Sequence, residues 1–90
     1  MYSRKTTIIN RSGLHARPAS DLTLKAKEFA SEITIVNLDK ESLDVNVKSI
    51  LKVLAAAIPM GARVEIRAEG NDEREAVDAL VQLIEAGFGE

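Results

Sequence analysis

The sequence contains no cysteine and no tryptophan, and only 3% of its 90 residues are aromatic. Without cysteine the chain cannot form disulfides, use thiolate chemistry or bind zinc through sulfur. So few aromatic side chains leave little with which to stack nucleic-acid bases. A formal net charge of −2 also argues against binding through many phosphate contacts. We therefore expect no cofactor, no metal and no nucleic-acid partner.

Long hydrophobic runs are also absent. The longest, residues 53–60, is interrupted by Pro59 and falls far short of the roughly 18 residues that span a bilayer. Residues 1–10 alternate polar and apolar side chains and lack the apolar segment of a signal peptide. These features predict a cytoplasmic protein without membrane insertion, and we expect the chain to be a monomer. With 46% apolar residues, the 90-residue chain is expected to form one domain over residues 1–90.

Hydrophobic periodicity predicts seven elements in the order β-α-β-β-α-β-α. Strands are expected at residues 6–10, 32–35, 43–47 and 63–69, and in the third strand Leu43, Val45 and Val47 should face the core. Because the later strands alternate apolar and polar side chains, we expect an antiparallel sheet with one solvated face. The predicted fold is an α+β open-faced two-layer sandwich, a four-stranded sheet covered on one face by three helices.

Local signals place the three helices. The first helix has Pro18 in its first turn. The second follows Ser49 as its N-cap, covers residues 50–57 and ends before Pro59. Asn71 can cap the third. The first helix should bury Ala19, Leu22, Ala26 and Phe29. The third should bury Ala76, Val77, Leu80, Leu83 and Ile84 and stop at Gly87.

The only histidine, His15, lies where the first strand leads into the first helix. A lone imidazole is poor material for a metal site, but a neutral imidazole is a good nucleophile. The first N–H groups of a helix and its dipole favour a negative group there, and Arg17 can add a charge-assisted pair. The pattern predicts that His15 carries a phosphoryl group held by Arg17 and by the Ala16 and Arg17 amides. The alternative is a capping or solvent-exposed histidine, with Arg17 an ordinary surface arginine.

Two short segments resemble the signatures of the HPr family of bacterial histidine phosphocarriers. They are Ser12-Gly13-Leu14-His15-Ala16-Arg17-Pro18-Ala19 and Lys48-Ser49-Ile50, and the resemblance extends over the whole chain. It implies that Nδ1 of His15 accepts a phosphoryl group from phospho-enzyme I, which phosphoenolpyruvate charges. The group would then pass to the enzyme IIA unit of a sugar permease. A carrier of this kind is a stoichiometric substrate and not an enzyme.

Ser49 has a second role in part of that family. In low-GC Gram-positive members the matching serine is phosphorylated by a dedicated kinase, and phosphoserine is compatible with a helix N-terminus. This sequence departs from their pattern, because Leu51 and Leu54 replace common methionines and Lys52 replaces glycine, as in enterobacterial carriers. Regulation by an HPr kinase/phosphorylase and simple capping by Ser49 both remain open.

The second helix is apolar around most of its circumference. Deep burial is one explanation, but a helix on one side of a two-layer sandwich must expose a face. If Val53, Ala56 and Ile58 point inward, the outer side chains form an apolar patch beside His15, which is typical of a partner site. With its neighbours on the first helix, this docking patch comprises Ser20, Leu24, Lys27, Ile50, Leu51, Lys52 and Leu54.

Other functions stay in consideration. The last residues, 83–90, resemble the nitrogen-related branch of the family, whose carriers have regulatory recipients. An RNA-binding or small-molecule-binding module is a different class, but the few aromatic residues form no stacking pair. A hydrolase lacks paired carboxylates and a second histidine. The connection at residues 37–42 is longer than in typical relatives and is predicted to be a surface insertion.

Overall fold

Strand β4 (Arg63–Glu69) and strand β2 (Glu32–Asn37) form the centre of a four-stranded antiparallel sheet. Strand β1 (Tyr2–Thr7) pairs with the other edge of β4, and β3 (Val45–Asn46) pairs with β2, giving the order β1-β4-β2-β3. The computed structural model describes residues 1–41 and 43–90. Alternate residues of β2 and β4 are buried, so one face of the sheet carries the core.

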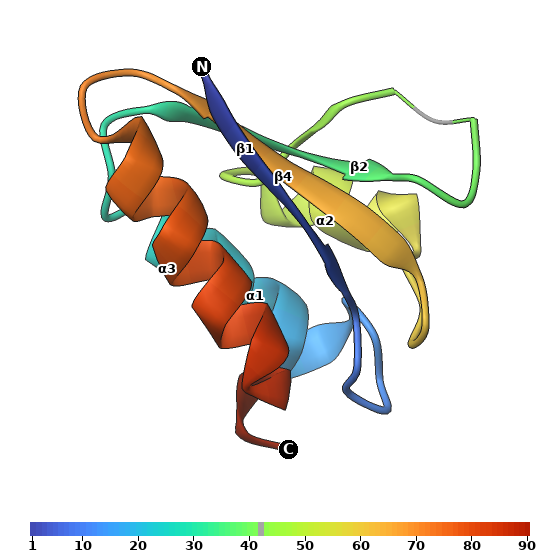
Figure 1. Cartoon of the computed structure of the whole chain (residues 1–90). Coiled ribbons are helices and arrows are strands. Elements are labelled where there is room, and N and C mark those ends of the chain that lie inside the picture. The colour runs from blue at the N-terminus through green and yellow to red at the C-terminus, as the bar shows by residue number, and fades with distance from the viewer. Residues whose placement is uncertain (42) are drawn as a thin grey trace.

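Three α-helices supply the other layer (Figure 1). They are α1 (Ala16–Ala26), α2 (Ile50–Ala56) and α3 (Glu73–Glu85), and a 3₁₀ turn, η1 (Gly87–Gly89), follows α3. Apolar side chains from the sheet and all three helices form one buried cluster. The predicted fold class is therefore confirmed. Within residues 1–41 and 43–90, no helix is long and apolar enough to cross a membrane.

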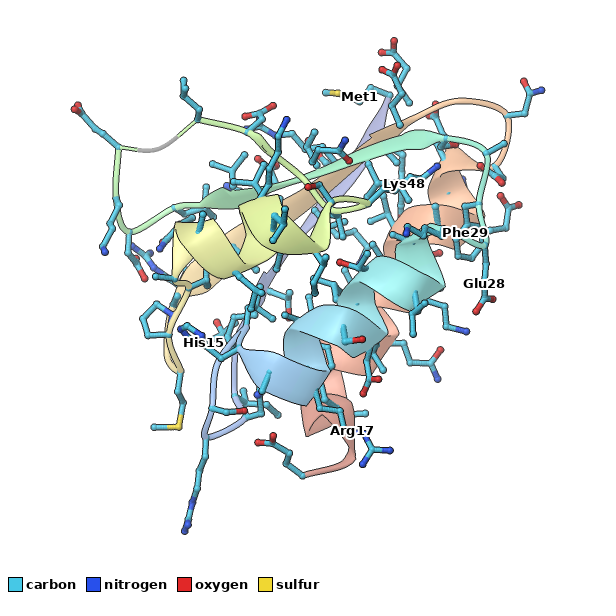
Figure 2. The ribbon with its side chains drawn as sticks, turned by 180° about the vertical axis from the view of Figure 1, so that it is seen from behind. Met1, His15, Arg17, Glu28, Phe29 and Lys48 are labelled. Atoms are coloured by element: carbon cyan, nitrogen blue, oxygen red, sulfur yellow. The ribbon has the colours of Figure 1, made fainter. Side chains whose placement is uncertain are left out.

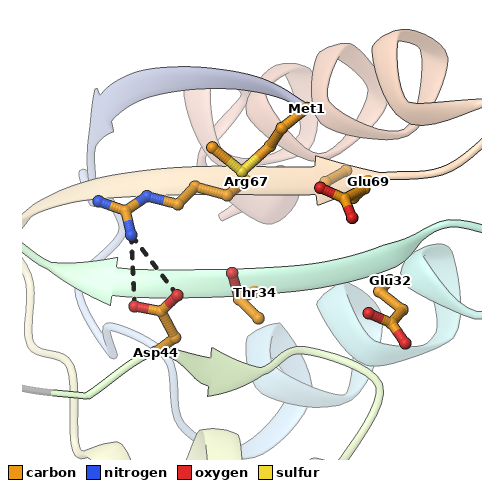
Figure 3. Close-up of a pocket in the computed structure, with 7 residues that line it drawn as sticks. Met1, Glu32, Thr34, Asp44, Arg67 and Glu69 are labelled. Carbon is orange, nitrogen blue, oxygen red and sulfur yellow. Dashed lines mark hydrogen bonds and ion pairs between the residues drawn. The ribbon is translucent and has the colours of Figure 1, made fainter.

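The opposite face of the sheet is polar. Arg67 Nη2 lies 2.7 Å from Glu65 Oε1, and Arg67 Nη1 lies 3.4 Å from Asp44 Oδ1 in a shallow depression (Figure 3). The hydrogen bond from Arg67 is the main cause that lowers the pKa of Glu65. Because this guanidinium is already paired, the depression is best explained as the solvated side of the sheet.

Two strands differ from their predicted limits. β1 begins at Tyr2 and ends at Thr7, so the prediction of residues 6–10 was wrong, because pairing with Arg63–Ala68 of β4 fixes its length. β3 covers only two residues, and Leu43 is 88% exposed, so its predicted core position was also wrong. Of the predicted connection at 37–42, Ser42 lies outside the described residues. The rest turns back to β4, where the Asp39 carboxylate accepts a 2.9 Å hydrogen bond from Arg63 N.

The helix predictions hold for α2 and need correction at the other two. Ser49 caps α2, since its Oγ accepts a 3.3 Å hydrogen bond from Lys52 N. α1 ends at Ala26, so Phe29 lies beyond the helix, although it is half-buried against the core.

In α3, the predicted cap and one core position were wrong. The N-cap residue is Asp72, not Asn71, and it makes no side-chain capping bond. Its carboxylate instead accepts hydrogen bonds from the backbone of Ala30 (2.8 Å) and Ser31 (2.9 Å), so a tertiary contact replaces the local one. Val81 is fully buried, whereas Leu83 is only half-buried.

Candidate functional site

A tight turn at residues 10–13 sets the start of the candidate site. Gly13 N donates a 3.1 Å hydrogen bond to Asn10 O, and Leu14 N donates a 2.9 Å bond to Ile58 O. Gly13 has a φ of +64°, and a Cβ there would lie 2.6 Å from Ile58 O and 2.9 Å from Pro59 Cα. Only glycine has both this backbone conformation and this clearance, so the turn packs directly on the segment that follows α2.

His15 is the N-cap residue of α1 and is exposed. Its backbone is extended, with φ −126° and ψ 162°, and its side chain makes no capping hydrogen bond. Ala16 then has a φ of 48°, and Pro18 has no N–H, so Ala16 and Arg17 supply the amide donors of the first turn. An accessible imidazole therefore stands beside backbone donors and the positive end of the helix dipole.

Arg17 lies on the same first turn but is directed away from His15. Figure 2 shows the two side chains leaving the start of α1 in different directions. The exposed Arg17 lines a depression with Asp21 and the C-terminal residues Phe88 and Glu90, and it forms no ion pair within residues 1–41 and 43–90. Among the described residues, no ion pair therefore holds the guanidinium in this position.

Two neighbours of the turn were not predicted from the sequence. Ser12 Oγ donates a 2.9 Å hydrogen bond to Glu90 Oε2, which brings the C-terminal segment beside the site. Asn10, predicted as the end of a strand, is instead buried, and its Nδ2 donates a 2.9 Å bond to Gly13 O. No sequence pattern predicts the first contact, because it joins residues 78 positions apart. For Asn10, the only signal is a polar residue at the end of an apolar segment.

The docking patch is partly exposed. Leu24 and Leu51 are 60% and 76% exposed, and Lys27 and Lys52 are also at the surface. The remaining members, Ser20, Ile50 and Leu54, are half-buried, and the last two pack against the core. Val53 is buried and Ala56 is half-buried against the core, so α2 turns one side inward, and Ile58, just beyond the helix, is buried as well. Met60 is 56% exposed in the turn next to the Gly13 contact and was not anticipated from the sequence.

Two hydrogen bonds attach the segment before α2 to α1. Thr23 Oγ1 donates a buried 2.9 Å bond to Val47 O, and Lys48 Nζ donates a 2.7 Å bond to Phe29 O. Figure 2 shows Lys48 beside Phe29, at the end of α1 remote from His15. These bonds fix α2 relative to α1, so both parts of the patch keep one mutual placement.

The site has no arrangement suited to a metal. In the part of the chain that the structure describes, no three or more histidine, cysteine, aspartate or glutamate side chains are grouped so that they could hold an ion.

Comparison with known proteins adds to this geometry. Residues 2–86 match the family described as "PTS HPr component phosphorylation site". The chain is 43% identical to a phosphocarrier protein HPr of Cupriavidus necator over 90 residues, covering 100% of this chain and 98% of that protein. It is also 43% identical to a multiphosphoryl transfer protein of Haemophilus influenzae over 84 residues. That match covers 93% of this chain but only 17% of the larger protein.

A solved structure agrees with the fold. The crystal structure of an HPr from Thermoanaerobacter tengcongensis superposes with a TM-score of 0.93 at 42% sequence identity. The match covers 100% of this chain and 98% of that one. The similarity therefore includes the helix that begins after His15 as well as the sheet.

Proposed function

The chain belongs to the HPr family of phosphocarriers of the phosphotransferase system, and on that premise we propose that His15 carries the phosphoryl group. The observation that supports this most directly is the exposed His15 imidazole at the N-terminus of α1. The lone pair of a neutral ring nitrogen, Nδ1 in the family, forms the new P–N bond. The bond between phosphorus and the donor breaks, and its electron pair leaves with the donor.

The phosphoryl group on His15 would be held by the amides of Ala16 and Arg17. Both belong to the first turn of α1, where N–H groups lack intrahelical acceptors. The Arg17 guanidinium would rotate from its present position toward the phosphoryl oxygens and add a charge-assisted bond. Stabilisation by two amides and one mobile arginine is moderate, which suits a group that must leave again.

We propose enzyme I as donor and enzyme IIA units of sugar permeases as acceptors, with the docking patch as the shared contact surface. Leu24 and Leu51 supply exposed apolar area beside the site, and Lys27 and Lys52 add positive charge. Such charge favours encounter with acidic partner surfaces. In this role residues 1–90 act as one carrier domain, monomeric and cytoplasmic, which is consumed and regenerated as a substrate rather than acting as an enzyme.

Ser49 is a second candidate for phosphorylation. Its half-buried side chain already caps α2, and a phosphate at a helix N-terminus is electrostatically favourable. Two added negative charges next to Leu51 and Lys52 would oppose docking without unfolding the helix. A purified HPr kinase, ATP and the Ser49→Ala variant as control test this role separately from that of His15.

The nitrogen-related alternative is not favoured. The similar proteins described above are a phosphocarrier protein HPr and a multiphosphoryl transfer protein, and the matched family is that of the phosphotransferase system. The sugar and the permease served are left to experiment.

The decisive experiment is intact mass after incubation with phosphoenolpyruvate and purified enzyme I. We expect one acid-labile phosphoryl group on the wild type and none on His15→Ala. A folded wild type that stays unmodified, while a control HPr is charged by the same enzyme, would overturn the proposal. Phosphorylation of His15→Ala would show that another residue carries the phosphoryl group.

A further inference from the structure

Asn10 is a buried polar residue in the turn that leads to His15. Only 4% of its surface is exposed. Its Nδ2 donates to Gly13 O at 2.9 Å and to Ser12 Oγ at 3.3 Å, while its own carbonyl accepts the 3.1 Å bond from Gly13 N. One side chain therefore contacts both residues that lie two and three positions before the histidine.

The bond from Asn10 acts on one particular peptide group. The carbonyl of the Gly13–Leu14 peptide accepts from Asn10 Nδ2, and the N–H of the same peptide donates to Ile58 O at 2.9 Å. The Leu14 side chain is completely buried. The peptide immediately before Leu14 is thus held from both sides, which fixes the direction in which the chain enters His15.

The two polar atoms of the Asn10 amide differ in their contacts. Asn10 Oδ1 is buried and has no hydrogen-bond partner among the described residues. An unpaired buried acceptor opposes folding, whereas the donor contact satisfies the Gly13 carbonyl, which a small apolar residue at position 10 would leave without Asn10 Nδ2. What the side chain does provide is the pair of donor contacts to Gly13 and Ser12.

We propose that Asn10 is a positioning residue for phosphoryl transfer, which holds the Gly13–Leu14 peptide so that His15 is presented to the partner in one orientation. The proposal rests on the proposed function of His15. Asn10 touches neither the phosphoryl group nor the docking patch, so it acts through the backbone. A misplaced acceptor lowers the rate within the complex, whereas weakened docking raises the KM.

The test compares wild type, Asn10→Asp and Asn10→Ala as substrates of enzyme I with phosphoenolpyruvate. Asn10→Asp keeps the shape of the side chain but lacks the donors, and Asn10→Ala removes the donors and the unpaired oxygen together. Ser31→Ala is the matched control. It also removes a buried side-chain hydrogen bond, to Asp72, at the opposite end of the sheet. Circular dichroism at the assay temperature establishes that each variant is folded.

We expect both Asn10 variants to show a kcat about tenfold lower, with a KM within about twofold of wild type, and Ser31→Ala to match wild type. Hydrogen exchange gives a second readout: the Leu14 amide should exchange faster in the Asn10 variants than in Ser31→Ala. A wild-type kcat in Asn10→Asp and Asn10→Ala, or a raised KM alone, overturns the inference and leaves the function of His15 intact. A wild type that enzyme I does not charge overturns the function itself.

Discussion

The ammonium nitrogen of Lys48 lies 2.7 Å from the carbonyl oxygen of Phe29, just beyond the C-terminal end of α1. This bond crosses from the segment before α2 to the segment after α1. The bond gives a donor to a carbonyl near the end of the helix that would otherwise lack one. It also places a positive charge at the negative end of the helix dipole.

Lys48→Met should therefore destabilise the fold. The variant keeps most of the alkyl chain but loses the charge-assisted bond, and we expect a loss of about 1 kcal/mol in the free energy of unfolding. Urea denaturation measures it. Lys40→Met is the control, because Lys40 is an exposed loop lysine. Equal stability of the two variants would mean that the bond to Phe29 contributes nothing.

Ala57→Gly should stabilise the protein. Ala57 is the C-cap of α2 and has φ 50° and ψ 47°, a left-handed conformation that disfavours residues with a Cβ. Part of the gain is offset by the larger entropy of glycine in the unfolded chain, so the net effect should be about 0.5–1 kcal/mol. Ala55→Gly, inside the same helix, should instead destabilise by a similar amount, about 0.5–1 kcal/mol. Thermal unfolding of both variants tests whether Ala57→Gly raises the stability of the protein and Ala55→Gly lowers it.

Gly13→Ala should damage the site. A Cβ would lie 2.6 Å from Ile58 O, so the turn would have to move in addition to adopting an unfavourable φ. We expect a loss of at least about 2 kcal/mol in stability and slower phosphorylation of His15. Gly61→Ala separates the effect of the unfavourable φ from that of the close contact with Ile58, because Gly61 also has a positive φ but has open space where a Cβ would lie. If both variants lose the same stability, the close approach to Ile58 is unimportant.

Acid should destabilise the fold partly through Asp72. Hydrogen bonds from Ser31 and Ala30 lower the pKa of Asp72 below its ordinary value of 3.8. A lowered carboxylate pKa contributes stability that is present above 3.8 and is lost as the pH falls through the folded-state value. Asp72→Asn should be less stable than wild type at neutral pH and should lose less stability on acidification. Unfolding midpoints between neutral and acid pH, with exposed Glu75→Gln as control, measure the difference.

Leu51→Ala should weaken partner binding without affecting the fold. Leu51 is 76% exposed, so its truncation should change the free energy of unfolding by less than about 0.5 kcal/mol. In a docking patch the same truncation should cost about 1 kcal/mol or more of binding, seen as a several-fold higher KM with enzyme I. Leu43→Ala removes an even more exposed leucine elsewhere. A raised KM in both variants would argue against a localised patch.

The sequence predicted what local patterns determine. Alternation identified the core face of β4, and the serine before α2 is its cap as expected. His15 is at the start of a helix, as its position before Pro18 indicated. Prediction from the sequence failed where contacts between distant segments determine the structure. The length of β1 is set by its pairing with β4, and the Asp72 carboxylate accepts hydrogen bonds from the α1–β2 turn instead of capping α3. Asn10 was missed for the same reason, because burial of its amide depends on the packing of the turn.

The bond between Ser12 and Glu90 has a practical consequence for labelling. A fluorophore or affinity tag joined after Glu90 would start beside the turn that leads to His15 and, in the proposed carrier role, would compete with partners for that surface. Met1 lies at the other end of the molecule, where its amino group pairs with Glu73 (Figure 1). A label attached there leaves the approach to His15 open, at the expense of one exposed ion pair.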